Sequence, residues 1–236
     1  MKPTRVGRRG RPPAVAEPGQ TDARAAILAA ATQEFAQKGF DGGRMDDIAR
    51  IACVSKNSLY YHFGSKDELF LAVLEQVYTI IRSRHNEVSL RDLAPDEAMR
   101  KLVRHTASIW IEFPEFGRIL ASENLQEARH MRHSHAILSM YNPLVDNIRL
   151  LLDAGARSGR FRADVNPIDL YISIAALSAY YIAHHHSFDA LFHENLMAPE
   201  RLEERIRHAE EMVLGFLHPH GTKPGCDAGR TSPRSR

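Results

Sequence analysis

The sequence predicts an all-α protein of about nine helices, divided into a small N-terminal head and a larger helical bundle. Apolar residues recur at the three- and four-residue spacing of helices along most of the chain. No segment shows the apolar–polar alternation of a half-buried strand. Helix start signals also recur, as in Ser65-Lys-Asp-Glu68 and Asn166-Pro167.

The first predicted helix runs from an N-cap at Thr21 through Lys38. Its inward face carries Ile27, Leu28, Ala31 and Phe35. Lys38 suits the negative end of a helix, and Gly39 suits its C-cap. Residues 1–20 are rich in Pro, Gly and Arg, and we expect them to be disordered.

Two short helices are predicted next, over residues 44–52 and 55–63, joined by Cys53-Val54. Ser55 can cap the second helix. The expected core positions are Met45, Ile48, Ala49, Ala52, Leu59 and Phe63. Two short helices with so brief a connection are typical of a helix-turn-helix.

The capping-box spacing of Ser65 and Glu68 then starts a long helix with Leu69, Phe70, Val73, Leu74 and Val77 on its apolar face. A further stripe ends before Pro114 and consists of Leu102, Thr106, Ile109 and Phe113. Residues 126–156 are predicted to be helical, with a kink at Asn142-Pro143.

The last two predicted helices carry the most apolar surface. One starts at Asn166-Pro167, runs to about His184 and is apolar nearly all round between Leu170 and Ala183. The other, over 201–216, has one stripe formed by Leu202, Ile206, Ala209, Val213 and Phe216. Together they offer more apolar surface than one chain readily covers, which predicts a homodimer.

The composition excludes several classes of protein. The chain has 236 residues, of which 44% are hydrophobic and 25% charged, as in a globular protein of one or two domains. No run approaches the roughly 20 apolar residues of a membrane span, and no secretory signal is evident. Cys53 and Cys226 are too few for a disulfide scaffold. We therefore expect a cytoplasmic protein without membrane partners.

The net charge of +2 is an average over unlike segments. It is +4 over residues 1–20, +1 over 21–66, −6 over 67–216 and +3 over 217–236. A basic N-terminal segment followed by an acidic segment is expected when one end of a protein faces a polyanion.

The head resembles the helix-turn-helix of the TetR family of transcriptional regulators. The similarity covers roughly residues 21–75 and lies in Asp46-Asp47-Ile48-Ala49, Val54-Ser55, Leu59-Tyr60-Tyr61-His62-Phe63 and Ser65-Lys66-Asp67-Glu68-Leu69. The resemblance implies double-stranded operator DNA as a partner, with the helix over 55–63 in the major groove.

The resemblance also implies roles for individual residues. Lys56, Asn57 and Ser58 become candidates for reading bases, and Tyr60, Tyr61 and His62 for contacts to the groove wall and phosphates. Lys66 matches a phosphate-contacting lysine, and Ser55 completes the set.

Two positions depart from the family pattern. Arg44 replaces the usual Thr cap but can reach phosphate, and Cys53 replaces a turn glycine, so a positive φ there would cost ~1 kcal/mol.

The N-terminal arm Arg8-Arg9-Gly10-Arg11-Pro12-Pro13 resembles an AT-hook core. Arg8, Arg9 and Arg11 are therefore candidates for the narrow minor groove of A·T-rich DNA. The alternative is a solubilising leader that contacts nothing.

TetR-like bodies bind a small effector, and the residues expected to face it here are Trp110, Phe113, Phe116, Glu123, Asn124, Arg129, His130, His133, Tyr141, Tyr180, Tyr181 and His184. Aromatic rings would cover a flat ligand and Arg129 could hold a carboxylate, although an aromatic residue at helical spacing is more often part of a core than of a ligand site. The segment from Glu123 to His130 resembles regulators of aromatic-acid catabolism of the NicS type.

The histidines leave a metal-responsive regulator as a minor alternative. His130 and His133 would share a helical face, whereas His184, His185 and His186 point in three directions on a regular helix. We expect no metal site and no cofactor. Nucleophile–base sets, phosphate-binding glycine loops and a His-Glu-x-x-His helix are lacking in the sequence, so no catalytic residues are expected.

These observations predict a homodimeric repressor, released by a ligand from a pseudo-palindromic operator. Its predicted parts are a basic arm (1–20), a helix-turn-helix domain (21–66), an effector and dimerisation domain (67–217) and a tail (218–236). The alternative is a helical ligand-binding or enzymatic protein whose head no longer binds DNA.

Overall fold

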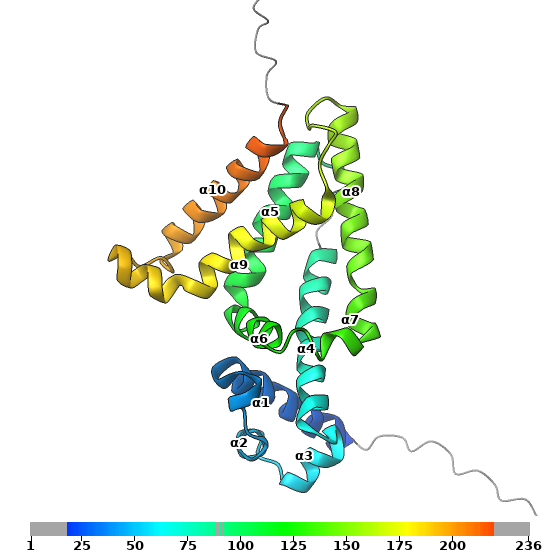
Figure 1. Cartoon of the computed structure of the whole chain (residues 1–236), viewed down its shortest axis with the longest axis vertical. Coiled ribbons are helices and arrows are strands. Elements are labelled where there is room, and N and C mark those ends of the chain that lie inside the picture. The colour runs from blue at the N-terminus through cyan, green and yellow to red at the C-terminus, as the bar shows by residue number, and fades with distance from the viewer. Residues whose placement is uncertain (1–17, 88–89, 91, 220–236) are drawn as a thin grey trace, which may run out of the picture. The chain divides into compact units, whose positions relative to one another are not determined.

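A computed structural model describes residues 18–87, 90 and 92–219, and in this part of the chain the fold is all-α, as predicted. The minor-groove candidates Arg8, Arg9 and Arg11 lie outside the described residues, as does nearly all of the tail. The elements (Figure 1) are α1 (Pro18–Gly42), α2 (Met45–Ile51), α3 (Lys56–Phe63), α4 (Lys66–Asn86), α5 (Pro95–Glu112), α6 (Pro114–Leu125), the short 3₁₀ helix η1 (Met131–His133), α7 (His135–Ser139), α8 (Tyr141–Arg157), α9 (Pro167–Phe192) and α10 (Pro199–Leu217).

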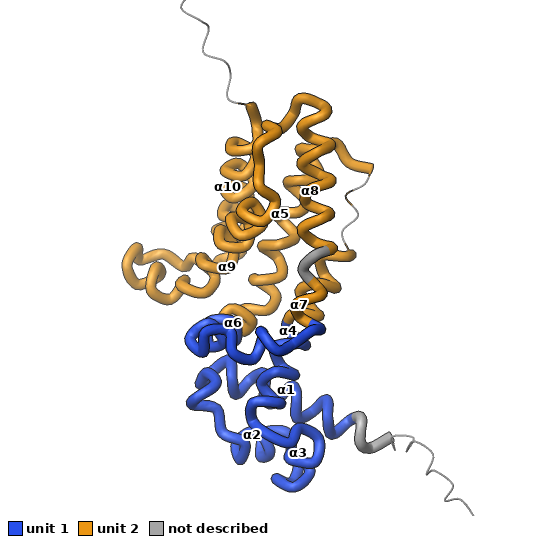
Figure 2. Tube along the Cα trace, turned by 45° about the vertical axis from the view of Figure 1, so that its right-hand side comes forward, with its two compact units in different colours: residues 1–77, 118–136 blue, residues 78–117, 137–236 orange. Residues whose placement is uncertain are grey.

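The chain divides into two compact units (Figure 2). Unit 1 comprises residues 1–77 and 118–136, and unit 2 comprises residues 78–117 and 137–236. The sequence places the end of the head at residue 66. The contacts instead extend unit 1 into α4 and add a segment from far along the chain. α4 is therefore shared, with its first half in unit 1 and its last turns in unit 2.

The core of unit 1 contains a cluster of three phenylalanines. Phe70 of α4 lies edge-on to Phe35 with 5.0 Å between ring centroids, and Phe40 lies at the same distance from Phe70. Gly39 between them has φ +69°, as its expected C-cap role requires, and kinks α1 before Gly42. The predicted start of this helix was wrong, because α1 begins at Pro18 and Thr21 lies inside it.

In unit 2, α5 packs against α8, α9 and α10, as Figure 1 shows. α5 can contact three helices because its buried residues follow a helical stripe that includes Met99, Leu102 and Val103. These pack with Ile148 of α8, Ile174 of α9 and a row from α10 formed by Ala209, Val213, Leu214 and Leu217. Asn166 caps α9 as predicted, since its side chain accepts hydrogen bonds from the Ile168 and Asp169 amides.

The prediction of a helix over 126–156, interrupted only by a kink at Asn142-Pro143, was wrong. α6 ends at Leu125, and η1, α7 and α8 follow as separate pieces. Glu127 and Ala128 both adopt positive φ, at 54° and 57°, which no α-helix accommodates. Asn142-Pro143 lies in the first turn of α8 rather than at a kink, because proline is tolerated there.

α9 is longer than predicted and only partly covered. It continues to Phe192, eight residues beyond His184. Its buried face is formed by Leu170, Ile174, Ser178 and Ile182. Its exposed apolar side chains are Ile168, Ile172, Tyr180, Leu191 and Phe192, and α10 adds Met212 and Phe216. Within the described residues, no helix is long and apolar enough to cross a membrane.

Candidate nucleic-acid interface

The helix-turn-helix forms as predicted, with α2 and α3 joined by a tight turn. At the end of α2 the Ala52 amide donates a hydrogen bond to the Ile48 carbonyl, and in the turn the Val54 amide donates to the Ala49 carbonyl. Cys53 between them has φ +55°, the left-handed conformation in which a family glycine would be unstrained. The side chain of Cys53 is exposed, so it does not itself pack into the core of the head.

α3 presents one face to solvent and buries the other. The Ser55 hydroxyl accepts a hydrogen bond from the Ser58 amide at 3.1 Å, which fixes the start of the helix. Leu59 and Phe63 are buried, whereas Asn57 is exposed and Tyr61 is 74% exposed. An exposed helix bearing amide and phenol groups can donate to base edges and phosphate oxygens.

Glu34 of α1 binds the backbone at the start of α2, where the usual hydroxyl cap is missing. Arg44 is the N-cap residue, and its side chain makes no capping hydrogen bond. Instead, Oε1 of Glu34 accepts from the Arg44 amide at 3.2 Å and from Lys38 Nζ at 2.8 Å. Glu34 is buried, so its charge needs these donors. The guanidinium of Arg44 stays exposed and available to phosphate.

Lys38 also joins α1 to α2 through Asp47. Its Nζ lies 3.1 Å from Asp47 Oδ2, and Arg50 approaches the other oxygen at 3.3 Å. The hydrogen bond from Lys38, followed by that from Arg50, lowers the pKa of Asp47. Asp47 is therefore ionised at neutral pH and orients α2 relative to the end of α1.

Lys56, a candidate base-reading residue, is engaged in an ion pair in the free chain. Its Nζ lies 2.7 Å from Asp46 Oδ1 on α2. This hydrogen bond raises the pKa of Lys56. Both side chains are largely exposed, so the pair is weak and Lys56 can exchange Asp46 for DNA.

Lys66 at the start of α4 lies against α1. Its Nζ donates to the Asp41 carbonyl at 3.2 Å and sits 4.7 Å from the centroid of the Phe40 ring. The Ser65 hydroxyl accepts from the Glu68 amide, which confirms the predicted start of this helix. Lys66 therefore has a structural contact besides the phosphate contact that the family resemblance implies.

Three of the residues that the sequence predicts to face an effector lie close together in the structure. They belong to one hydrogen-bonded cluster. Glu123 is buried, and its Oε1 accepts from the His130 and Met131 amides, both at 2.8 Å. Its Oε2 lies 2.7 Å from His130 Nδ1. The other ring nitrogen of His130 is 3.3 Å from Asp67 Oδ1, which also accepts from Arg129 at 2.8 Å.

This cluster joins the segment after α6 to the head within unit 1. The His130 ring packs on Phe40 at 4.7 Å and on Phe70 at 5.0 Å. Both its nitrogens are engaged, and His133 is exposed in η1 rather than one helical turn away. The idea that His130 and His133 share a metal-binding helix face was therefore wrong.

The other residues predicted to face an effector lie at separate places within unit 1 or within unit 2. Trp110 and Phe116 are buried core residues, and Phe113 stacks on Phe116 at 4.8 Å. Tyr180 and His184 stack on each other at 4.0 Å on the exposed side of α9. Asn124 is exposed in unit 1, and the side chain of Tyr141 lies outside the described residues.

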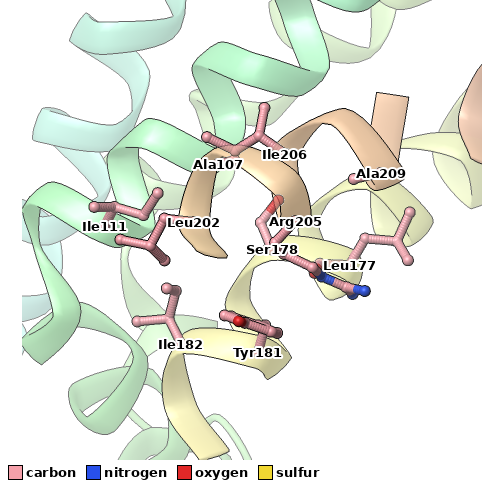
Figure 3. A pocket seen from close by; sticks show the side chains of 10 residues that line it. All are labelled: Ala107, Ile111, Leu177, Ser178, Tyr181, Ile182, Leu202, Arg205, Ile206 and Ala209. Carbon is pink, nitrogen blue, oxygen red and sulfur yellow. The ribbon is translucent and has the colours of Figure 1, made fainter. Parts of the chain in front are cut away.

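Tyr181 lines a narrow pocket between α5, α9 and α10, drawn in Figure 3. Its volume is about 10 Å³, room for about one water molecule. Arg205 borders the same pocket, donates to the Leu177 carbonyl and lies over the Tyr181 ring. The pocket is therefore too small for an organic effector.

A larger cavity of about 610 Å³ in unit 2 was not foreseen from the sequence. It is lined by the end of α4, by described residues between α4 and α5, by the start of α5 and by much of α8. Its polar lining residues are His85, Asn86, Glu87, Asn147 and Arg157. Its apolar ones include Leu90, Leu93, Leu102, Leu144, Ile148 and Leu151. The volume is in the range of sites that enclose a small molecule.

His85 at the edge of this cavity is held as a neutral imidazole. Its Nδ1 donates to the Ile81 carbonyl at 2.7 Å, and Nε2 lies 3.2 Å from the Thr106 hydroxyl. Burial lowers the pKa of His85 to about 4. Since the unfolded chain protonates this residue near 6.5, its contribution to stability is present above that pH and is lost as the pH falls toward 4.

We therefore expect His85→Gln to reduce the acid sensitivity of folding. Between about pH 7 and about pH 5, the wild-type free energy of unfolding should fall by about 2 kcal/mol more than that of the variant. Urea unfolding followed by circular dichroism at both pH values measures this difference. His208→Gln, at an exposed position, serves as the control. Equal pH dependence in wild type and His85→Gln would contradict the expectation.

Two family models match the chain. Residues 27–73 match the one described as bacterial regulatory proteins of the tetR family, and residues 95–213 match a tetracyclin repressor-like C-terminal domain. The HTH-type transcriptional repressor NicS of Pseudomonas putida is 34% identical over 191 residues, which cover 81% of this chain and 90% of NicS. The HTH-type transcriptional regulator RutR of Escherichia coli is 27% identical over 194 residues, 82% of this chain and 90% of RutR.

Solved structures agree on the fold. The ketosteroid transcriptional regulator KstR2 of Mycobacterium tuberculosis superposes with a TM-score of 0.63 at 21% identity, over 84% of this chain and 95% of that one. At this level of identity the similarity concerns the arrangement of helices alone.

Proposed function

Because the chain belongs to the TetR family of DNA-binding transcriptional regulators, we propose that it is a homodimeric repressor that a small molecule releases from its operator. It acts in the cytoplasm on DNA and catalyses no reaction. The observation that carries the proposal is the helix-turn-helix, in which a capped α3 presents exposed Asn57 and Tyr61 beside the cations Arg44, Lys56 and Lys66.

The effector site is proposed to be the larger cavity in unit 2 rather than the residues expected from the sequence. Its apolar lining suits a hydrophobic ligand body, and its amide, imidazole and guanidinium groups suit a polar or carboxylate end. Neutral His85 lines the cavity without the desolvation penalty of a charged group, and because its Nδ1 proton is donated to the Ile81 carbonyl, its Nε2 can only accept a hydrogen bond.

α4 is the element proposed to carry the signal. Its last residues, His85 and Asn86, line the cavity, and its first, Lys66 and Asp67, contact α1 and the segment after α6. A ligand that binds one orientation of α4 more tightly than another would shift the population of DNA-competent dimers.

We expect Asn57→Ala and Tyr61→Ala to weaken DNA binding in different ways. Loss of a base-reading side chain should change which operator bases are preferred, at about 1–3 kcal/mol for the affected base pair. Loss of Tyr61, as a phosphate contact, should weaken binding to all sequences alike. Fluorescence anisotropy with DNA from the region upstream of the gene, at two salt concentrations, measures both.

The control for this experiment is Leu125→Ala, an exposed side chain of unit 1 outside the helix-turn-helix. It should bind DNA like the wild type. If the wild type forms no complex even at low salt, the proposed function fails. If Asn57→Ala leaves every base preference intact, the base-reading role of Asn57 is wrong while the function stands.

A further inference from the structure

Three side chains near the C-terminal end of α9 converge on one another. Donor atoms of His185, His186 and Asp189 all lie within 4.8 Å of each other. On a helix, Asp189 lies one turn after the two histidines and between their directions, because residues three and four apart share a face. The His-His-x-x-Asp spacing therefore puts two imidazoles and a carboxylate on one side of α9.

The first histidine is oriented by its own helix. Nδ1 of His185 lies 2.8 Å from the Ile182 carbonyl, and a carbonyl can only accept, so Nδ1 carries the proton. This contact leaves Nε2 of His185 as the nitrogen with a free lone pair. A backbone carbonyl that fixes the tautomer of a histidine is the usual outer partner of a metal-binding imidazole.

The carboxylate is oriented by the loop that follows α9. Oδ1 of Asp189 accepts a hydrogen bond from the Leu196 amide at 2.8 Å. The Leu196 carbonyl in turn accepts from the Tyr181 hydroxyl at 3.0 Å. Leu196 itself is buried, so this connection is anchored on both sides. Oδ2 of Asp189 remains for another partner.

The neighbouring His184 makes the same kind of backbone contact but lies outside the cluster. His184 stacks on Tyr180, and its Nδ1 lies 2.9 Å from the Tyr180 carbonyl. It is not a member of the cluster. The expectation that three consecutive histidines cannot share one ion therefore holds for His184, while Asp189 replaces it as the third group.

We propose that His185, His186 and Asp189 form a binding site for a divalent transition-metal ion of the zinc class. Two imidazoles and a carboxylate are the donors that such ions prefer, and three protein ligands leave a coordination position for water. Zn–N and Zn–O distances of about 2.0–2.2 Å require donors closer together than 4.8 Å, and small rotations of these partly exposed side chains supply that movement.

Binding of the ion would stiffen the junction between α9 and α10. Asp189 would then hold the ion and the Leu196 amide at once, so the loop over 193–198 loses freedom when the site fills. This inference goes beyond the proposed repressor function and uses neither the helix-turn-helix nor the larger cavity.

Titration of the full-length chain with Zn²⁺ in a competing chromophoric chelator tests the site. The wild type should bind one ion per chain more tightly than its other histidines do. His186→Ala and Asp189→Asn should each lower this affinity at least about tenfold, since even outer partners of metal ligands contribute 10–100-fold. Asp189→Asn retains an oxygen for the Leu196 amide, so its loss of affinity reports the charge and not the loop.

His184→Ala is the matched control, because it removes an adjacent histidine outside the cluster. It should bind Zn²⁺ like the wild type, and circular dichroism should show all variants to be equally helical. An equal loss in His184→Ala and His186→Ala would overturn the proposal, as would a wild type without a one-to-one site. DNA binding is measured separately, so these outcomes leave the repressor proposal untouched.

Discussion

Replacing Glu123 by alanine is expected to lower the free energy of unfolding by about 3–5 kcal/mol, a large effect for a single substitution. The reason is that Glu123 is only 2% exposed and receives the amides of His130 and Met131 as well as His130 Nδ1. Its removal leaves these buried donors without an acceptor. Urea unfolding followed by circular dichroism measures the loss.

Glu123→Gln separates charge from shape. An amide oxygen can still accept from the two backbone amides, so we expect this variant to lose less, about 1–3 kcal/mol. Glu127→Ala is the control, since Glu127 is an exposed glutamate of the same loop. A loss below about 1 kcal/mol in Glu123→Ala would show that the loop is held by packing against Phe40 and Phe70 instead.

The regular elements were predictable because their physical causes are local. Ser55, Ser65 and Asn166 each cap a helix through a hydrogen bond to an amide two or three residues later, and the sequence contains both partners. Apolar spacing likewise locates α3 and α5. The start of α1 and the end of α9 were predicted wrongly, because packing rather than apolar spacing determines where these helices start and stop.

The contacts that position the site were not predictable, because they join residues far apart in the sequence. Nothing near Glu34 indicates that it accepts from the Arg44 amide, and nothing near Glu123 indicates a loop folded around its carboxylate. Glu123, Arg129 and His130 were expected to face a ligand. Glu123 and His130 are instead buried against each other, and the exposed Arg129 shares Asp67 with His130, so the three form a hydrogen-bonded cluster at the edge of the core.

The larger cavity in unit 2 could not be predicted from the sequence either. Its walls come from α4, α5, α8 and residues between α4 and α5 such as Leu90 and Leu93, and the wall residues in the helices also fit ordinary helix patterns. Leu102, for example, belongs to the α5 core stripe and lines the cavity as well. A cavity depends on the distances between packed helices, and no single residue of the sequence determines these distances.

The second large effect is expected at the exposed apolar pairs of the last two helices. Ile168 and Ile172 lie one turn apart on α9, as do Met212 and Phe216 on α10, and all four are about half exposed. Such stripes fit the proposed dimer surface. The double variant Ile172→Asp, Phe216→Asp should therefore be monomeric at micromolar concentration, which sedimentation velocity measures, because dimerisation would bury four carboxylates.

The loss of the dimer should abolish tight operator binding although no DNA-contacting residue is changed. A dimer engages the second half-site at a high effective concentration, so its separation should weaken binding to a palindrome at least 100-fold, by the scale of bivalent binding. Affinity for a single half-site should stay the same. Leu125→Asp, which adds a charge at an isolated exposed leucine of unit 1, should leave both mass and affinity unchanged. A double variant that still sediments as a dimer would place the interface elsewhere on the chain.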